Sequence, residues 1–204
     1  MSDINNKLRP DLQTICEWIT PQSRILDLGC GDGTLLSMLK KERDVNGYGL
    51  EIEVSNIVKC INANVNVIQA DLNAGLSEFD DNTFDYVVMT QALQAVERPD
   101  RLLNDMLRVG REGIVTFPNF GHLRSRLQLG FGGHMPVTPT LPSKWFNTQN
   151  IHLCTLQDFE QLCADNHIKI LQRTVVDRHH RSSIGMRLFP NLLGEVAIYR
   201  IKNH

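Results

Sequence analysis

Three glycines on alternate positions, Gly29, Gly31 and Gly33, separate two apolar runs in the stretch "ILDLGCGDGTLL" at residues 25–36. A strand-like run, a glycine turn and a helix-like run in this order are typical of a site for a nucleotide-like cofactor. The dinucleotide pattern G-x-G-x-x-G is not met, because Thr34 occupies its third glycine position. Glycine turns vary, so the mismatch alone does not decide which cofactor is bound.

Carboxylates around this turn narrow the choice of cofactor. Asp27 precedes the turn and Asp32 lies inside it, where the pyrophosphate of a dinucleotide would rest on the helix N-terminus. Negative charges there repel a phosphate, and they suit the sulfonium and ammonium groups of S-adenosylmethionine. In the alternative interpretation, the two aspartates only cap the helix and form the turn. We predict that Asp27 and the three glycines bind S-adenosylmethionine or S-adenosylhomocysteine.

Two further acids end predicted strands at positions that suit the same cofactor. Glu51 lies 20 residues after Gly31, the spacing at which a carboxylate accepts hydrogen bonds from the hydroxyls of a ribose. Asp71 can accept a hydrogen bond from the adenine amine while the backbone of Leu72 meets the ring edge; its alternative role is to form a turn. Gln91, after the fourth predicted strand, completes the predicted cofactor-binding residues.

Two histidines, His122 and His152, are the candidate catalytic residues. An imidazole can act as a base near neutral pH, and the alternative for each is a structural histidine with one hydrogen bond. Gln91 and Asn119 are further polar residues that could face a methyl acceptor, and Arg9 could reach the carboxylate of the cofactor. Methyl transfer depends on alignment and exclusion of water more than on a strong catalytic group. No metal site is predicted.

The elements that must position these residues alternate between strand and helix patterns after a leading helix at residues 8–19. Such alternation predicts a parallel sheet with right-handed crossovers. The last two β-type runs have no helical crossover pattern between them, so we expect them to pair antiparallel. The predicted strands are residues 24–29, 48–52, 65–71, 84–90, 112–119, 168–176 and 191–201, and the later helices are residues 32–41, 54–62, 99–109 and 155–166. Thr155 and Asp158 form a possible capping box for the last helix.

Between residues 120 and 154 the alternation stops. This segment contains glycines, prolines and large apolar residues without a sustained period, and it is long for a plain connection. We expect either a lid over the cofactor or an interaction surface. Arg124 and Arg126, with His122, form a basic cluster on a short helix. The cluster is either a solvated face or a site for a carboxylate-bearing substrate or an acidic partner.

The composition indicates one α/β domain over residues 1–204, with residues 120–154 as an insertion. The net charge of −2 argues against a nucleic-acid partner, which needs a clustered cationic face. Five scattered cysteines without a C-x-x-C pair are typical of reduced thiols in the cytoplasm. No apolar stretch has the length of a membrane span, and the N-terminus lacks the apolar region of a signal peptide. We therefore expect a cytoplasmic protein without a membrane partner.

Four motifs, "ILDLGCGDG", "YGLEI", "QADLN" and "FDYVVMTQAL", resemble the successive motifs of the class I S-adenosylmethionine-dependent methyltransferases over residues 20–120. The resemblance implies a Rossmann-like α/β fold with a seven-stranded, mostly parallel sheet that ends in an antiparallel C-terminal hairpin strand. The Asn/Asp-Pro-Pro-aromatic motif of the amino-methyltransferases of DNA is replaced by "TQAL".

Four other stretches, "LRPDLQ", "QALQAVERPD", "MLRVGREGIVTFPNFGH" and "MPVTPTLPSKWFNTQNIHLCTLQDF", extend the resemblance to nearly the whole chain. They are similar to the methionine biosynthesis protein MetW family. This resemblance implies an S-adenosylmethionine-binding, methyltransferase-like protein that acts as a partner or activator of homoserine O-acyltransferase. The alternative is a free-standing methyltransferase that acts on a small acid or a protein side chain.

Overall fold

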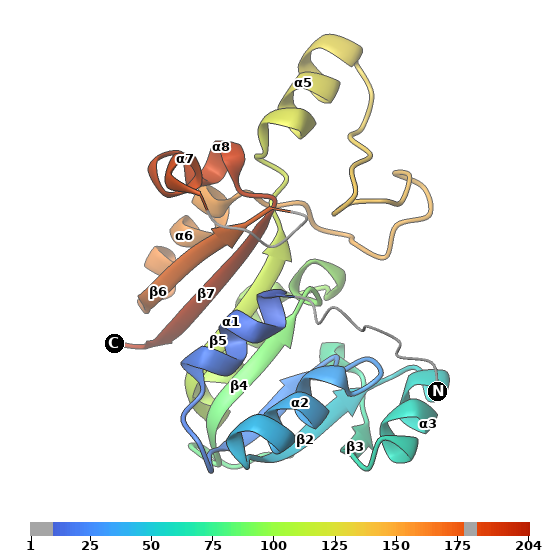
Figure 1. Cartoon of the computed structure of the whole chain (residues 1–204), viewed down its shortest axis with the longest axis vertical. Coiled ribbons are helices and arrows are strands. Elements are labelled where there is room, and N and C mark those ends of the chain that lie inside the picture. The colour runs from blue at the N-terminus through green and yellow to red at the C-terminus, as the bar shows by residue number, and fades with distance from the viewer. Residues whose placement is uncertain (1–9, 178–182) are drawn as a thin grey trace, which may run out of the picture.

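The computed structural model describes residues 10–177 and 183–204, and its centre is a seven-stranded sheet with helices on both faces (Figure 1). The strand order is β3-β2-β1-β4-β5-β7-β6. The first five strands in this order are parallel, and β7 runs antiparallel to both β5 and β6. The predicted fold class is confirmed. The strands are β1 Arg24–Leu28, β2 Asn46–Glu51, β3 Asn66–Gln69, β4 Phe84–Thr90, β5 Gly110–Pro118, β6 Ile168–Val176 and β7 Val196–Asn203.

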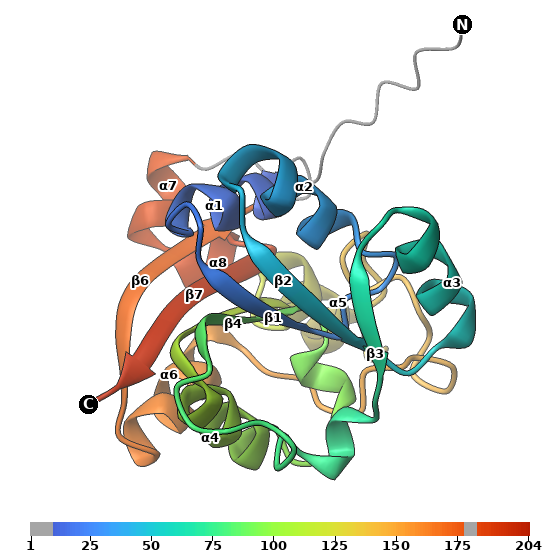
Figure 2. The same ribbon diagram turned by 90° about the horizontal axis from the view of Figure 1, so that it is seen from below.

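Helices cover the two faces of the sheet as separate layers (Figure 2). One face packs against α1 Pro10–Trp18, α2 Thr34–Arg43 and α3 Val54–Asn62, and the other packs against α4 Pro99–Val109 and α6 Leu156–Asp165. The shorter elements are α5 Leu123–Gly132, α7 Ile184–Leu188, α8 Pro190–Leu193, and the 3-10 turns η1 Leu72–Ala74 and η2 Leu93–Ala95. No described helix has the length and apolar character needed to cross a membrane.

Apolar residues at helical spacing build both layers. Leu12, Ile15 and Ile19 of the leading segment are buried, as their spacing predicts. In α4, Leu103 and Leu107 lie one turn apart and are buried against the central strands. Each such side chain stabilises the fold by about 1.5–3 kcal/mol through burial of apolar surface. These layers leave the carboxyl ends of the parallel strands free to carry functional residues.

The strand predicted at residues 191–201 begins later than expected, and this part of the prediction is wrong. Pro190 occupies the first turn of α8, where a missing N–H costs nothing, and the helix ends before Gly194. A Cβ at Gly194 would lie 2.5 Å from the Cβ of Val175, so this close passage requires glycine. β7 starts at Val196. β6 and β7 pair antiparallel, as predicted. The helices between them, α7 and α8, are too short to form the crossover that a parallel pair needs.

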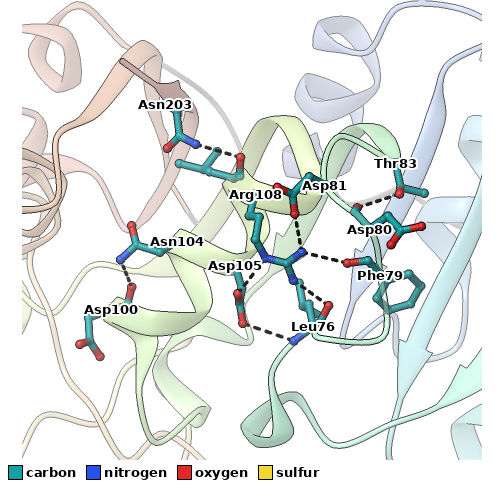
Figure 3. A network of polar contacts seen from close by, with 11 residues as sticks. Leu76, Phe79, Asp80, Asp81, Thr83, Asp100, Asn104, Asp105, Arg108 and Asn203 are labelled. Carbon is teal, nitrogen blue, oxygen red and sulfur yellow. Dashed lines mark hydrogen bonds and ion pairs between the residues drawn. The ribbon is translucent and has the colours of Figure 1, made fainter.

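Arg108 of α4 fastens the chain between β3 and β4 (Figure 3). Its guanidinium donates to the carbonyl oxygens of Leu76 and Phe79 at 2.9 Å each, and to the carboxylate of Asp81 at 2.8 Å. Asp105 accepts a further hydrogen bond from Arg108 and one from the backbone N–H of Leu76. The network fixes one end of the loop that begins at Asp71, and this loop borders the candidate site.

Residues 120–154, called the arm below, leave the carboxyl end of β5 and return to α6. The arm contains α5 and a long irregular stretch, and it projects beyond the strand ends, away from α3 (Figure 1). Asn119 holds the N-terminal end of the arm, called its first root below; the C-terminal end is the second root. The side-chain amide of Asn119 donates to the carbonyl oxygens of Asn191 at 2.9 Å and Gly194 at 2.8 Å, and its Oδ1 accepts from Gly121 N. Because Asn119 is buried and fully bonded, the expectation that it faces a methyl acceptor is wrong.

Candidate functional site

The candidate residues converge where the strand order changes direction. β1 has β2 on one side and β4 on the other, so the connections after β1 and β4 run to opposite sides. Ligands of open α/β sheets bind at such a switch point, outside the carboxyl ends of the strands. The glycine turn, Glu51, Asp71 and Gln91 follow β1, β2, β3 and β4 respectively.

The glycine turn is shaped by backbone contacts and by close packing. Gly29 N and Cys30 N both donate to Leu50 O, at 2.9 and 3.0 Å, which bends the chain out of β1. Gly33 has φ +78°, and a Cβ there would lie 3.0 Å from the Sγ of Cys60. Gly31 has φ +56°, but a Cβ there would meet no atom within 4 Å. Packing therefore requires Gly33, whereas Gly31 faces open space that a ligand can fill.

Glu51 binds the glycine turn directly. Its Oε2 accepts a hydrogen bond from Gly31 N at 2.8 Å, and its Oε1 accepts from Ile52 N and Glu53 N at 2.9 Å each. Only 8% of the residue is exposed. A carboxylate has about four acceptor positions, so three bonds leave room for a ligand hydroxyl at Oε2. This arrangement fits the predicted contact with a ribose.

Buried thiols beneath the turn report a negative environment. Burial raises the pKa of the Cys30 thiol, and the charges of Asp27 and Glu51 raise it further. The pKa of Cys60 is also raised by burial first, and then by the charges of Asp32, Glu51 and Asp27. Asp27 itself is fully buried in β1. The carboxylates of Asp27, Asp32 and Glu51 therefore lie near the same pair of thiols.

Asp32 and Asp71 both make the contacts of turn-forming residues. The Oδ1 of Asp32 accepts from the backbone N–H of Thr34 at 3.1 Å and from its hydroxyl at 2.6 Å. The hydroxyl bond is the main reason that the pKa of Asp32 is lowered. Asp71 caps η1 by accepting from Asn73 N at 2.9 Å. Both side chains remain exposed, so the role of Asp71 in adenine binding stays a prediction.

Apolar side chains complete the site, and sequence reasoning missed two of them, Ile52 and Ala92. A Cβ at Gly29 would lie 3.2 Å from the Cβ of Ala92 and 3.8 Å from Leu72, so the ends of β1, β3 and β4 meet here. Ile52 directly follows Glu51 and is 58% exposed at the strand end. The signal was present in "YGLEI", where an apolar residue continues past the strand-ending acid. Ile52 and Leu72 offer apolar surface for a flat ring.

Gln91 is exposed and adopts a left-handed backbone conformation, with φ +58°. Its backbone N–H donates to the carbonyl oxygen of Thr116 at 2.9 Å and to its hydroxyl at 3.1 Å, which holds the turn after β4 against β5. Positive φ at a residue other than glycine is unusual and is often found at functional sites. Gln91 therefore directly follows the carboxyl end of β4, next to Ala92.

The two candidate catalytic histidines lie at the roots of the arm. His122 caps α5: its Nδ1 accepts from Arg124 N at 3.2 Å, and burial lowers the pKa of the imidazole below its ordinary value of 6.5. His152 is exposed, and its Nε2 lies 3.2 Å from the carbonyl oxygen of Glu97. Among the described residues, neither ring forms a hydrogen bond with the glycine turn or Glu51. Arg9 lies outside the described residues.

The strand order, the switch point and the glycine turn after β1 together define the fold of the class I S-adenosylmethionine-dependent methyltransferases. A solved relative in fold is the magnesium protoporphyrin IX methyltransferase (ChlM) from Synechocystis PCC 6803 with bound SAH. The two chains superpose with a TM-score of 0.65 at 16% sequence identity, over 96% of this chain and 83% of that one. A likeness at this identity shows the fold alone.

Residues 9–201 match the model of the family described as methionine biosynthesis protein MetW, and the chain belongs to this family. The bifunctional methionine biosynthesis protein MetXA/MetW of Rhodopirellula baltica is 35% identical over 97% of this chain and 33% of that protein. The ubiquinone/menaquinone biosynthesis C-methyltransferase UbiE of Vibrio cholerae is 30% identical over 74% of this chain and 55% of that protein. The chain thus spans a third of the first relative's length and about half of the second's.

Proposed function

We propose that this chain binds S-adenosylmethionine or S-adenosylhomocysteine and acts as a partner and activator of homoserine O-acyltransferase in methionine biosynthesis. The observation that carries the proposal is the Rhodopirellula relative, whose name joins two methionine biosynthesis functions, MetXA and MetW, in one chain. Linking two modules keeps them at high effective concentration, which is useful when they act together. The resemblance of the arm and its flanking motifs to the MetW family points to the same partner.

The residues around the glycine turn fit the proposed cofactor. Glu51 would hold the ribose, and Asp71 with Leu72 would hold the adenine, which Ile52 can cover. The open space at Gly31 would receive part of the cofactor, and Asp27 and Gln91 stay predicted binding residues. Bound S-adenosylmethionine supplies an activated methyl group. The concentration of free S-adenosylmethionine also reflects the output of methionine synthesis.

Regulation by the cofactor requires a difference in affinity between two states of the protein. If the complex with the acyltransferase binds the cofactor more weakly than the free chain does, the cofactor lowers the affinity of the chain for the acyltransferase by the same factor, and stimulation of acyl transfer falls as the complex dissociates. The proposed activator then reports methionine supply without transferring a methyl group.

A free-standing methyltransferase is the second candidate function, and the identity with UbiE favours it. The acceptor would be a small acid or a protein side chain, and His122 or His152 would act as the base. For His122 this role competes with its cap on α5, because a protonated Nδ1 cannot accept from Arg124 N.

A reconstituted assay tests the proposal against this alternative. The purified cognate acyltransferase is assayed with and without this protein, while S-adenosylmethionine is titrated into the mixture. In parallel, labelled methyl incorporation is followed in cell extract. We expect that the chain stimulates acyl transfer, that S-adenosylmethionine lowers this stimulation, and that no labelled product forms. A defined labelled product together with unchanged acyl transfer would favour the methyltransferase.

A further inference from the structure

The arm carries most of the exposed apolar surface of the described residues. Ten of the nineteen large apolar side chains that are exposed there lie between residues 120 and 154. Phe131 is 89% exposed, Trp145 74% and Phe146 65%. Large apolar side chains exposed in such number are typical of an interaction site, and Trp and Phe are the side chains that interfaces favour at their centres.

The arm holds this surface in place with its own hydrogen bonds. The side chain of Gln128 brackets Val137, accepting from its N–H at 2.9 Å and donating to its carbonyl oxygen at 3.2 Å. Thr138 and Leu141 pair through two backbone hydrogen bonds of 3.0 and 3.1 Å. The aromatic side chains are thus presented by a formed scaffold, which lowers the entropy cost of binding a partner.

A hollow in the arm is of a size that suits a side chain and not a cofactor. Its volume is about 60 Å³, and it is lined by Phe120, Met135, Leu141, Trp145 and Leu153 among others. Sites for small molecules and cofactors have volumes of about 300–1,000 Å³. The hollow therefore fits the apolar anchor residue of a protein partner.

The charges of the arm select the character of that partner. Residues 120–154 include Arg124, Arg126 and Lys144 but no Asp or Glu, although the whole chain has more acidic than basic residues. The guanidinium Nε–H of Arg126 donates to the carbonyl oxygen of Gly121. Arg124, Arg126 and Lys144 are all exposed, and Lys144 Nζ lies 5.8 Å from the centre of the Phe146 ring. A second copy of the chain bound arm to arm would place like charges together, which disfavours self-association.

We propose that the arm is the docking surface for homoserine O-acyltransferase, and that the matching surface on that enzyme is an apolar patch with an acidic rim. This inference rests on the proposed function and adds the location and chemistry of the contact. It assigns residues 120–154 to an interface and not to a lid. Because the arm leaves β5 at the same sheet edge as the glycine turn, a docked enzyme would lie close to the cofactor site.

Single substitutions on the exposed surface test the inference in the full chain. Trp145→Ala and Phe146→Ala remove the apolar centre, and Arg124→Glu and Lys144→Glu reverse the rim charges. The matched controls lie outside the arm: Ile61→Ala on α3, which is 63% exposed, and Lys169→Glu on β6. The dissociation constant for the purified acyltransferase and the stimulation of acyl transfer are measured for each variant. S-adenosylhomocysteine binding by each variant shows that the fold is intact.

We expect each aromatic variant to weaken binding at least tenfold, and each charge reversal to slow association, most strongly at low salt. The controls should bind within twofold of the unchanged chain. If the unchanged chain binds and all four arm variants bind equally well, the docking surface is elsewhere and the proposed function stands. If the unchanged chain neither binds nor stimulates the acyltransferase, the proposed function fails, and the inference fails with it.

Discussion

The glycine turn and the arm occupy the same edge of the sheet but have opposite chemistry. At the turn, backbone N–H groups and carboxylates are paired over short distances, and the apolar residues beneath them are buried. In the arm, large apolar side chains face outward and the only charged side chains are basic. The first region suits the small cationic ligand proposed above, whereas the second suits the larger, acidic partner surface proposed for the arm.

The two regions differ in whether contacts within the chain account for their structure. Contacts within the chain account for the glycine turn, because Glu51 and Gly33 satisfy local packing and hydrogen bonding even without a ligand. Trp145 and Phe146 contact each other but remain 74% and 65% exposed, so most of their apolar surface is not buried by this chain. Natural surfaces keep such patches where they are covered by another molecule. The cofactor site can therefore be understood from the fold, and the arm only from a partner.

The two regions are joined at two points near the strand ends. Asn119 bonds the first root of the arm to the turn around α8. Gln94, in η2, holds the C-terminal end of the arm. Its backbone carbonyl oxygen accepts from Ile151 N at 2.8 Å and from His152 N at 3.0 Å. Its side-chain amide donates to Pro118 O at 3.2 Å. Variants at these roots can separate the arm from the rest of the chain.

The largest effect is expected for Asn119→Ala, which breaks the first root. The variant leaves one buried carbonyl oxygen, one partly buried carbonyl oxygen and one buried N–H without a partner, so the free energy of unfolding should fall by about 2–4 kcal/mol. Hydrogen exchange should accelerate within residues 120–154. Urea unfolding and exchange mass spectrometry measure the two effects.

The control for this prediction is Asn104→Ala, which removes two hydrogen bonds from an exposed asparagine. It should change stability by about 0.5 kcal/mol or less, as is usual for surface substitutions. If Asn119→Ala also removes S-adenosylhomocysteine binding while the protein remains folded, the two regions are coupled and their separation is wrong.

The next effect concerns the cofactor site. Glu51→Ala removes the ligand contact and the bond to Gly31, so the affinity for S-adenosylhomocysteine should fall by about 1.5–3 kcal/mol, which is roughly 10- to 150-fold. Asp71→Ala should cost less, about 0.5–1.5 kcal/mol, because this carboxylate is exposed and competes with water. Calorimetry on both variants gives the order. Equal losses of affinity in the two variants would contradict the expectation that buried Glu51 contributes more to binding than exposed Asp71.

Sequence reasoning succeeded where the relevant contacts are local and failed where they are distant. Thr155 and Asp158 form the predicted capping box, which needs only residues three positions apart. The 20-residue spacing from Gly31 to Glu51 predicted a ribose contact, which stays a prediction, and the structure shows a hydrogen bond between the two residues. The structural role of Asn119 depends on Asn191 and Gly194, 72 and 75 residues away, and no local pattern predicts such partners.

The sequence also did not predict which apolar side chains are exposed. The apolar content of residues 120–154 indicated either a lid or an interface, because composition does not show which way a side chain points. The helix at residues 190–193 was missed for a related reason, since "NLLG" suits a strand as well as a short helix. The exposed position of Ile52 likewise depends on where β2 ends.

The smallest effect is expected from pH, through His122 at the first turn of α5. Burial lowers the pKa of this imidazole, while Glu195 opposes and Arg124 adds to the shift. Since the unfolded chain then binds a proton more readily than the folded chain, the stability contributed by neutral His122 is present above pH 6.5 and is lost as the pH falls below it. Protonation also abolishes the acceptor at Nδ1 and places a positive charge at a helix N-terminus.

His122→Asn isolates this effect, because asparagine is a good N-cap that does not titrate. Between pH 7.5 and 5.5, the original chain should lose up to about 1 kcal/mol more unfolding free energy than the variant, the usual worth of a cap. Amide exchange in α5 should accelerate over the same interval only in the original chain. Parallel pH profiles for the two proteins would show that the cap does not titrate there. If the two proteins differ in amide exchange only within the arm and bind S-adenosylhomocysteine equally well, the arm responds to pH and the glycine turn does not.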